Sequence, residues 1–255
     1  NGELQKGTAI PPIYYMARMF LRQTFNLGGG QEYIAGAPNQ LASNVDKRRL
    51  SISYGSFSAL DFFDANTYSH DPRTQFLNWS LMASGAYDYA ASSRGYTYGL
   101  VAEYYHDPEW VLRIARLAMP KSPNELDLDY GLTQEYGDQA EITHAHAVDG
   151  QPGKVRFLLF KNQGLMSTYT DAINFGISTN TTPDIFNTRY AYQTKWGYAI
   201  NGEQAFTEHI GAFARWSWNN GQTETQAFTD ISNSLSGGLS IKGTYWGRSQ
   251  DTVGI

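Results

Sequence analysis

The chain has 255 residues, of which 15% are aromatic and only 17% are charged, against about a quarter charged in soluble domains. The formal net charge is -5, which excludes a nucleic-acid surface because such a surface needs a basic face to meet phosphate. Cysteine is absent, so disulfides, thiolate metal sites and a cysteine nucleophile are excluded. The chain begins at Asn1 without a charged-then-apolar leader, and we expect any signal peptide to have been removed.

Hydropathy and aromatic content together indicate a membrane protein built from strands. The mean hydropathy is -0.45, and no run approaches the eighteen or so consecutive apolar residues of a membrane-spanning helix. Helical spans are therefore excluded. A closed barrel crosses a bilayer with strands that alternate apolar and polar residues, and this keeps the average hydropathy low.

Two-residue alternation predicts the strands, because successive side chains of a strand face opposite sides of the sheet. In chain order, the alternating segments are 13–25, 49–55, 95–105, 110–114, 154–162, 190–200 and 210–218, with weaker ones at 227–231 and 239–242. In the first segment, Ile13 and Tyr15 belong to the apolar face, while Arg18 and Arg22 lie on the other. In the third segment, Tyr96 belongs to the apolar set.

The segments between these strands support a wide barrel. Two long insertions, 58–93 and 164–187, interrupt the strands, and a long loop can fold inward to narrow a lumen. Arg116 lies on the apolar phase of its segment, which indicates either a bulge or a strand that has already left the membrane. A soluble β-sandwich would alternate as well. The polar face nevertheless combines Arg with Ser and Gly and lacks the mixed Lys and Glu of a solvated surface, so we predict an all-β, antiparallel transmembrane barrel.

Two adjacent blocks carry a family resemblance. Residues 53–64 (SYGSFSALDFFD) and 68–79 (YSHDPRTQFLNW) resemble the carbohydrate-selective porin family of the OprB type, and the Asp-Pro-Arg block is the most specific of its motifs. Blocks 18–25, 95–99, 120–124, 213–218 and 246–248 agree, so the similarity covers nearly the whole chain.

The resemblance implies a Gram-negative outer-membrane barrel of sixteen strands that passes glucose and related sugars by facilitated diffusion, often as a trimer. This chain has only about nine or ten predicted strands, whereas an aqueous channel needs roughly sixteen. We therefore expect residues 1–255 to be an interior portion of one barrel domain, with strands missing at both ends. The expected partners are carbohydrate solutes, outer-membrane lipid and lipopolysaccharide, and further copies in a homotrimer, with no cofactor and no nucleic acid.

The candidate pore residues follow from the chemistry of sugars, which offer many hydroxyls and apolar ring faces. A selective channel needs fixed donors and aromatic planes that still let the solute leave, and the planar fork of arginine supplies five donors. The predicted pore-lining residues are Arg18, Arg22, Glu103, Arg113, Arg156, Arg189, Lys195 and Arg215, and those of the constriction loop are Asp64, His70, Asp71, Arg73 and Trp79. Alternatively, these residues order the pore by pairing with acidic groups, and Asp71 pairs with Arg73 inside the loop.

Metal and catalytic sites are weaker interpretations, and we predict neither. Asp61 and Asp64 lack the spacing of a calcium-binding EF-hand loop. His144 and His146, with Asp149 nearby, could bind a divalent ion, although histidines near a loop are more often hydrated. The acidic group at 125–129 indicates a solvated turn more than the paired carboxylates of glycoside hydrolysis. Nucleophile-elbow and phosphate-loop motifs are absent.

Three functions remain open at this point. The first is a passive channel for glucose-like monosaccharides and short oligosaccharides. The second is a general or anion-preferring porin, since the charges predicted to face the lumen are mostly basic. The third is a secreted carbohydrate-binding or carbohydrate-cleaving β-protein, which would be soluble without detergent.

Overall fold

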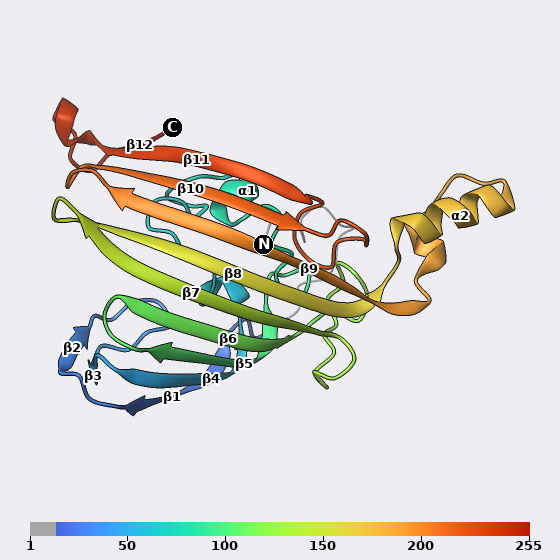
Figure 1. The fold of residues 1–255 in the computed structure, drawn as a ribbon, viewed down its shortest axis with the longest axis horizontal. Helices are drawn as coiled ribbons and strands as arrows, with labels where there is room; N and C mark the ends of the chain where they lie inside the picture. Colours follow the sequence, from blue (N-terminus) through green and yellow to red (C-terminus); the bar gives the residue numbers. More distant parts are fainter. Residues whose placement is uncertain (1–13) are drawn as a thin grey trace.

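A computed structural model describes residues 14–255 of the chain (Figure 1). Ten strands form one antiparallel sheet in the order β1-β4-β5-β6-β7-β8-β9-β10-β11-β12, and β2 pairs with β3 in a separate two-stranded sheet. Each strand of the large sheet is therefore bonded to neighbours that are close in sequence. The predicted all-β antiparallel fold is confirmed.

The large sheet consists of strands of very different lengths. They are β1 (Met19–Asn26), β4 (Arg49–Phe57), β5 (Thr97–Tyr105), β6 (Trp110–Ala118), β7 (Tyr136–Val148), β8 (Gln151–Met166), β9 (Ala191–Ala205), β10 (Ile210–Asn219), β11 (Asn233–Lys242) and β12 (Thr252–Gly254). The small sheet contains β2 (Gln31–Ile34) and β3 (Ser43–Asp46). The helices are α1 (Trp79–Met82) and α2 (Tyr169–Thr179), with short 3-10 turns η2 (Ala59–Asp61), η3 (Ile185–Thr188) and η4 (Gly243–Trp246).

The connections at the two ends of the sheet differ in length. Residues 106–109, 149–150 and 206–209 make tight turns at one end, which we name the short-turn end. The same end also has two longer connections, 27–48, which contains the small sheet, and 243–251. Residues 58–96, 119–135, 167–190 and 220–232 connect strands at the opposite, long-loop end. Figure 1 shows α2 projecting beyond the sheet at the long-loop end. Among residues 14–255, β1 and β12 each pair with a single strand of the large sheet, so the sheet is open.

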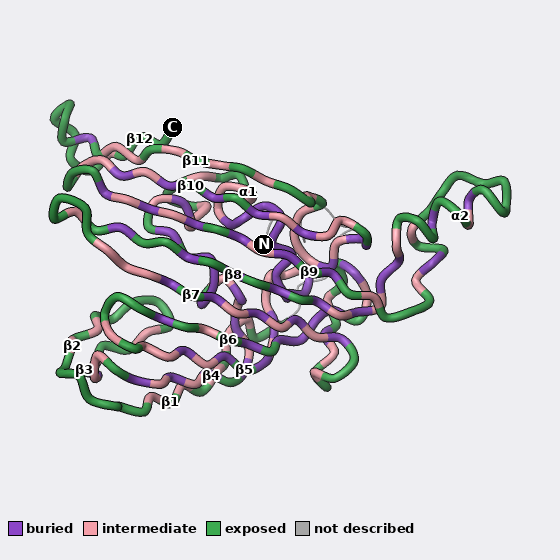
Figure 2. The backbone as a smooth tube through the Cα atoms, in the orientation of Figure 1, coloured by how far each residue is buried: buried purple, intermediate pink, exposed green. Residues whose placement is uncertain are grey.

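The two faces of the sheet differ in polarity, as the alternation predicts. Buried and exposed residues alternate along the long strands (Figure 2). The convex face exposes large apolar side chains, including Leu112, Ile114, Phe157, Trp196 and Trp216, which are 41% to 52% exposed. An outward apolar band of this kind is typical of a wall that faces lipid. Within the described residues, none of the helices has the length and apolar sequence needed to span a bilayer.

The loop formed by residues 58–96, which we name the inward loop, packs against the concave face. Phe63 and Tyr87 of this loop are fully buried, in one apolar cluster with Phe57, Leu117 and Phe160 of the strands. Tyr87 and Phe160 have ring centroids 5.3 Å apart. Burying aromatic side chains of this size contributes several kcal/mol in total, so this segment is part of the folded core.

Three details differ from the sequence-based predictions, and one prediction is not tested. Residues 227–231 form no strand, because the backbone N–H groups of Ala227 and Phe228 bind the Asp88 carboxylate of the inward loop and that of Ile231 binds Thr229 O. The second long loop is 167–190 instead of 164–187, since β8 continues to Met166. Strand β7 was not predicted as a strand of this length. Ile13 lies outside the described residues.

Arg116 is accommodated without a bulge. The register of β5 and β6 runs continuously through the pair Leu100 and Arg116. The guanidinium binds Asp138 of β7 in a bidentate pair at 2.8 Å and 2.8 Å, and it lies 4.0 Å from the ring centroid of Tyr136. A cation at this strand position is therefore neutralised across the strands.

Candidate functional site

The inward loop is fastened to the concave face by the carboxylate of Asp64. This carboxylate is 1% exposed and accepts hydrogen bonds from Ser84 N at 2.5 Å and from Asn201 Nδ2 at 2.6 Å. The Arg215 Nε lies 3.3 Å from its Oδ1. Because Asn201 and Arg215 belong to β9 and β10, one side chain joins the loop to two distant strands.

Asp88 makes a second attachment, between the inward loop and residues 220–232. Its carboxylate accepts the backbone N–H groups of Gln226, Ala227 and Phe228 at 2.8 Å, 2.9 Å and 3.1 Å. The Lys195 Nζ lies 3.7 Å away, and both side chains are almost fully buried. Two long loops from the same end of the sheet are thus held together inside its curve.

Ion pairs also line the concave face below the loop. Arg113 lies 3.1 Å from Glu103 and 3.2 Å from Glu141, and it donates to Thr143 Oγ1 at 2.9 Å. Arg156 lies 3.1 Å from Glu203. Arg113 faces Glu103 of β5 and Glu141 of β7 directly, whereas Arg156 of β8 reaches Glu203 diagonally, because its direct partner in β9 is Asn201. The charges are thus paired across the wall.

Three adjoining cavities lie along the concave face beside the inward loop. The first, of 500 Å³, is at the long-loop end; the second, of 610 Å³, follows it; the third, of 260 Å³, is at the short-turn end. The first and second cavities share Arg18, Leu60, Asp61, His70 and Arg73 as lining residues. The second and third share Ala65, Tyr105 and Arg113, so together the cavities trace a route from one end of the sheet to the other.

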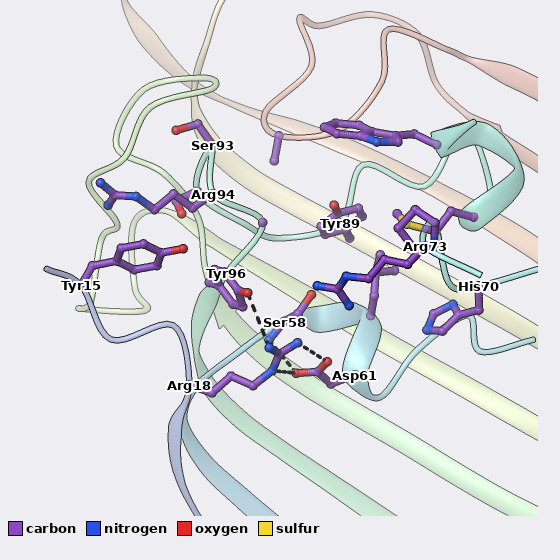
Figure 3. A pocket seen from close by; sticks show the side chains of 17 residues that line it. Tyr15, Arg18, Ser58, Asp61, His70, Arg73, Tyr89, Ser93, Arg94 and Tyr96 are labelled. Atoms are coloured by element: carbon purple, nitrogen blue, oxygen red, sulfur yellow. Dashed lines mark hydrogen bonds and ion pairs between the residues drawn. The ribbon is translucent and has the colours of Figure 1, made fainter. Parts of the chain in front are cut away.

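The boundary between the first two cavities is polar (Figure 3). Arg18 binds Asp61 in a bidentate pair, with both N–O distances 2.8 Å, and its guanidinium lies 5.1 Å from the ring centroid of Tyr96. Arg73 extends from the inward loop into the same cavity (Figure 3). Trp79 stacks on Phe228 with centroids 6.2 Å apart and planes 5° from parallel. The cavity therefore combines guanidinium donors with aromatic planes.

Burial and hydrogen bonding shift the pKa values of two side chains in the inward loop. Desolvation lowers the pKa of the His70 imidazole below its usual value, so this ring is neutral near pH 7. The backbone N–H of Arg73 and the Thr74 hydroxyl lower the pKa of Asp71, because both bind its ionised carboxylate. Near neutral pH the fixed charges at the cavity boundary are thus those of arginine and aspartate.

Comparison with known proteins identifies the family. The model of the carbohydrate-selective porin family, OprB, matches residues 5–255. The chain belongs to this family. Among curated proteins, none matches the chain.

A solved structure agrees at the level of the fold. The high-pH structure of Pseudomonas putida OprB matches with a TM-score of 0.59 and 17% sequence identity, over 80% of this chain and 49% of that one. This chain therefore spans about half the length of that porin. The likeness supports the architecture of this OprB-family chain.

The residues predicted to line the pore fall into two groups in this OprB-family chain. Arg18, Arg22, Glu103, Arg113 and Arg156 line the cavities. Arg22 donates to Gln40 and Ser53 at 2.8 Å and 3.0 Å.

The second group of predicted pore-lining residues binds and supports the long loops. Lys195 and Arg215 are buried beneath the loops, where they bind their carboxylates and backbone carbonyls. Arg189 belongs to residues 167–190 and pairs with Glu224 at 2.5 Å. These three lie away from the lining of the three cavities.

The predicted constriction residues divide in the same way. His70, Arg73 and Trp79 line the first cavity. Asp64 is an anchor under the loop and lines none of the three cavities. Asp71 holds the turn of the loop through the backbone N–H of Arg73, so the predicted pairing of these two residues runs through the backbone.

Sequence reasoning missed several residues that line or support the site. Tyr15 and Tyr96, assigned to the apolar outer face, instead line the first cavity, because both precede the strands whose alternation they seemed to continue. Arg94 lines the same cavity. Sequence reasoning also missed Glu141 and Glu203, the acids that pair with the wall arginines. The pattern that could have found them is an acidic residue at a strand position whose neighbours on the same face are buried.

The two histidines considered as metal ligands lie on the convex face. The His144 ring stacks on Trp110 with centroids 4.2 Å apart, and His146 Nε2 lies 3.1 Å from Gln204 Oε1. Among residues 14–255, no group of three or more potential ligands gathers to hold a metal ion. The stacking with Trp110 accounts for the position of the His144 ring.

Proposed function

We propose that this chain forms part of an outer-membrane channel through which carbohydrates diffuse passively into the periplasm. The observation that carries the proposal is the row of three adjoining cavities between the long-loop and short-turn ends. Membership of the carbohydrate-selective porin family supports the choice of solute. A passive channel needs no catalytic group, and we assign no enzymatic activity to the chain.

The lining chemistry suits neutral sugars. Arginine and carboxylate groups offer donors and acceptors to hydroxyls, while Trp79, Tyr89 and Tyr96 offer planes to the apolar faces of sugar rings. The wall arginines are already neutralised by Glu103, Glu141 and Glu203. A sugar therefore meets a hydrogen-bonding surface that binds it weakly enough for release.

We also propose the placement of the channel in the membrane. Outer-membrane barrels have short periplasmic turns and long extracellular loops, so the short-turn end faces the periplasm and the inward loop enters from outside. The convex apolar face contacts lipid, and the outer rim contacts lipopolysaccharide. By the family resemblance we propose a homotrimer, which the mass of the detergent-solubilised complex would test.

Liposome swelling with the full-length protein tests the proposed function. Glucose, a disaccharide and mannitol, a neutral polyol close to glucose in size, are compared in vesicles with and without the protein. Faster entry of glucose than of mannitol supports a sugar-selective channel. Equal entry of the two would leave a general diffusion pore, and no entry above protein-free vesicles would refute channel function.

A further inference from the structure

The first cavity carries an excess of positive charge. Three arginines and one aspartate line it, namely Arg18, Arg73, Arg94 and Asp61, which leaves a net charge of +2 with His70 neutral. The chain as a whole has a net charge of -5. The positive charge is therefore local to the first two cavities, since Arg18, Arg22, Arg73 and Arg113 also outnumber Asp61 and Glu103 by two in the second.

The charge excess disappears toward the short-turn end. The third cavity is lined by three basic and three acidic residues, which are Arg113, Lys154, Arg156, Glu32, Asp107 and Glu109, and its net charge is zero. An anion that enters at the long-loop end would thus meet attraction first and a neutral exit afterwards. Conduction requires this combination, because a solute bound tightly along the whole path would not leave.

Two guanidinium groups of the first cavity lack a carboxylate partner. Arg18 is paired with Asp61. Among residues 14–255, neither Arg73 nor Arg94 forms an ion pair. Asp71, the acid next to Arg73, already binds the backbone N–H of Arg73 at 2.9 Å and the Thr74 hydroxyl at 2.9 Å. The side-chain donors of Arg73 therefore extend freely into the cavity (Figure 3).

Arg94 is oriented by an aromatic ring. Its guanidinium lies 4.3 Å from the ring centroid of Tyr15, and its Nε is a buried donor without a hydrogen-bond partner in the described residues. A buried donor left without a partner is unfavourable, and a carboxylate would match it. Figure 3 shows Tyr15 and Arg94 together on one side of the cavity.

The remaining lining identifies the kind of anion. Trp79, Tyr89 and Tyr96 present rings to the cavity, whose volume of 500 Å³ is within the usual range for small-ligand sites. Rings of this kind suit the apolar face of a pyranose, and guanidinium forks match carboxylates in geometry and charge. A ligand that uses both features is a sugar with one carboxylate.

We propose that the first cavity selects acidic monosaccharides, of the hexuronate class, over neutral hexoses. This inference rests on the proposed carbohydrate channel and names the preferred substrate class of its entrance. Arg73 and Arg94 lie on different sides of the cavity (Figure 3), and each offers a guanidinium partner to the carboxylate, while the aromatic side chains face the ring. Arg18 stays paired with Asp61 and contributes hydrogen bonds to hydroxyls.

The test is uptake of radiolabelled glucuronate and glucose into proteoliposomes that contain the full-length protein. Potassium with valinomycin supplies a permeant counter-ion, so that charge does not accumulate. A cleft of one charge sign raises local substrate concentration about tenfold or more, and we expect glucuronate to enter about tenfold faster than glucose at low salt. The advantage should shrink as KCl is raised, because salt screens exposed charges.

Variants assign the effect to the cavity. Arg73→Gln and Arg94→Gln should each reduce the ratio of glucuronate to glucose uptake, and the double variant should bring it close to one while glucose uptake persists. Arg248→Gln is the matched control, because Arg248 is 71% exposed and its one ion pair among residues 14–255 is with Asp251, three residues away. It should leave both rates unchanged.

The outcomes separate this inference from the proposed function. Equal uptake of the two sugars, or a ratio unchanged in the double variant, would overturn the acidic-sugar inference and leave the carbohydrate channel in place. An acetate flux that matches glucuronate and falls equally in the variants would overturn it too, since the cavity would then select charge without a ring. Failure of both sugars to enter would refute the proposed function as well.

Discussion

Replacing Asp64 by alanine should release the inward loop from the wall. The pair of Asp64 Oδ1 and Arg215 Nε is 3.3 Å apart, and both side chains are 1% exposed. At an effective dielectric constant of 20, an attraction over this distance is about 5 kcal/mol. Removing one member of a buried pair costs about 3 to 5 kcal/mol, because the other charge stays buried. The population of the detached loop should then rise about 10²- to 10³-fold.

Single-channel recording of the full-length protein in planar bilayers measures this effect. The wild-type channel should show one conductance level, and Asp64→Ala should add transitions to a higher level as the loop leaves the lumen. The double variant Asp64→Ala with Arg215→Met should recover part of the wild-type behaviour, since neither charge is then left alone. Asp71→Ala is the control, because its carboxylate accepts hydrogen bonds from Arg73 N and Thr74 Oγ1 of its own turn and from no strand among residues 14–255.

A conductance trace for Asp64→Ala that matches the wild type would contradict this reasoning. It would mean that the aromatic cluster alone holds the loop and that the buried ion pair contributes little to its position. A higher level in Asp71→Ala of the same size would contradict it as well. Either result would mean that the contact between Asp64 and β10 is not what holds the inward loop in place.

Three further predictions concern the wall and a loop. Arg113→Met should lower the free energy of unfolding, measured by thermal unfolding in detergent, by about 3 to 5 kcal/mol, because two buried carboxylates lose their partner. Arg116→Met removes a member of an exposed ion pair and should cost about 1 kcal/mol or less. Equal losses in the two variants would refute the distinction between buried and exposed pairs. Burial and a neighbouring aspartate raise the pKa of Glu135 to about 7, so the folded state keeps this proton while the unfolded state loses it near pH 4.5. The unfolding temperature should therefore fall as pH rises from 5 to 7, Glu135→Gln should flatten that dependence, and an unchanged slope would count against it. In β9, a Cβ added at Gly197 would lie 2.2 Å from the backbone oxygen of Trp218, whereas a Cβ at Gly202 would lie 3.9 Å from that of Ala214. Gly197→Ala should therefore lower the free energy of unfolding by about 1 to 3 kcal/mol, and Gly202→Ala should leave it unchanged.

The sequence predicted the strands whose two faces contrast strongly. In β9 and β10, Trp196 and Trp216 alternate with polar or small residues, and the structure confirms their outward phase. Strand β7 was harder, because its concave face carries Gln139, Glu141 and Thr143 while its convex face mixes Ile142 with His144. A strand with so few apolar residues on its apolar face has little hydrophobic periodicity to detect.

The site was predicted only in part, because pairing depends on register and on loop paths. Arg113 was correctly placed on the concave phase, but its partner Glu141 belongs to the strand that was not recognised. Tyr15 and Tyr96 continue an alternation beyond the ends of β1 and β5, where the backbone is no longer a strand and the phase no longer applies. The role of Asp64 depends on residues more than 130 positions later in the chain.

The anchoring of the inward loop also sets an order of folding events. The loop directly follows β4, yet its partners Asn201 and Arg215 lie 137 and 151 residues after Asp64. Contacts of such sequence separation form late, since the chain between them must first be ordered. The loop therefore docks after β9 and β10 have joined the sheet, and the assembling wall has an open interior until then. Docking of the inward loop therefore depends on β9 and β10 being paired in the correct register, because that register places Asn201 and Arg215 where Asp64 binds them.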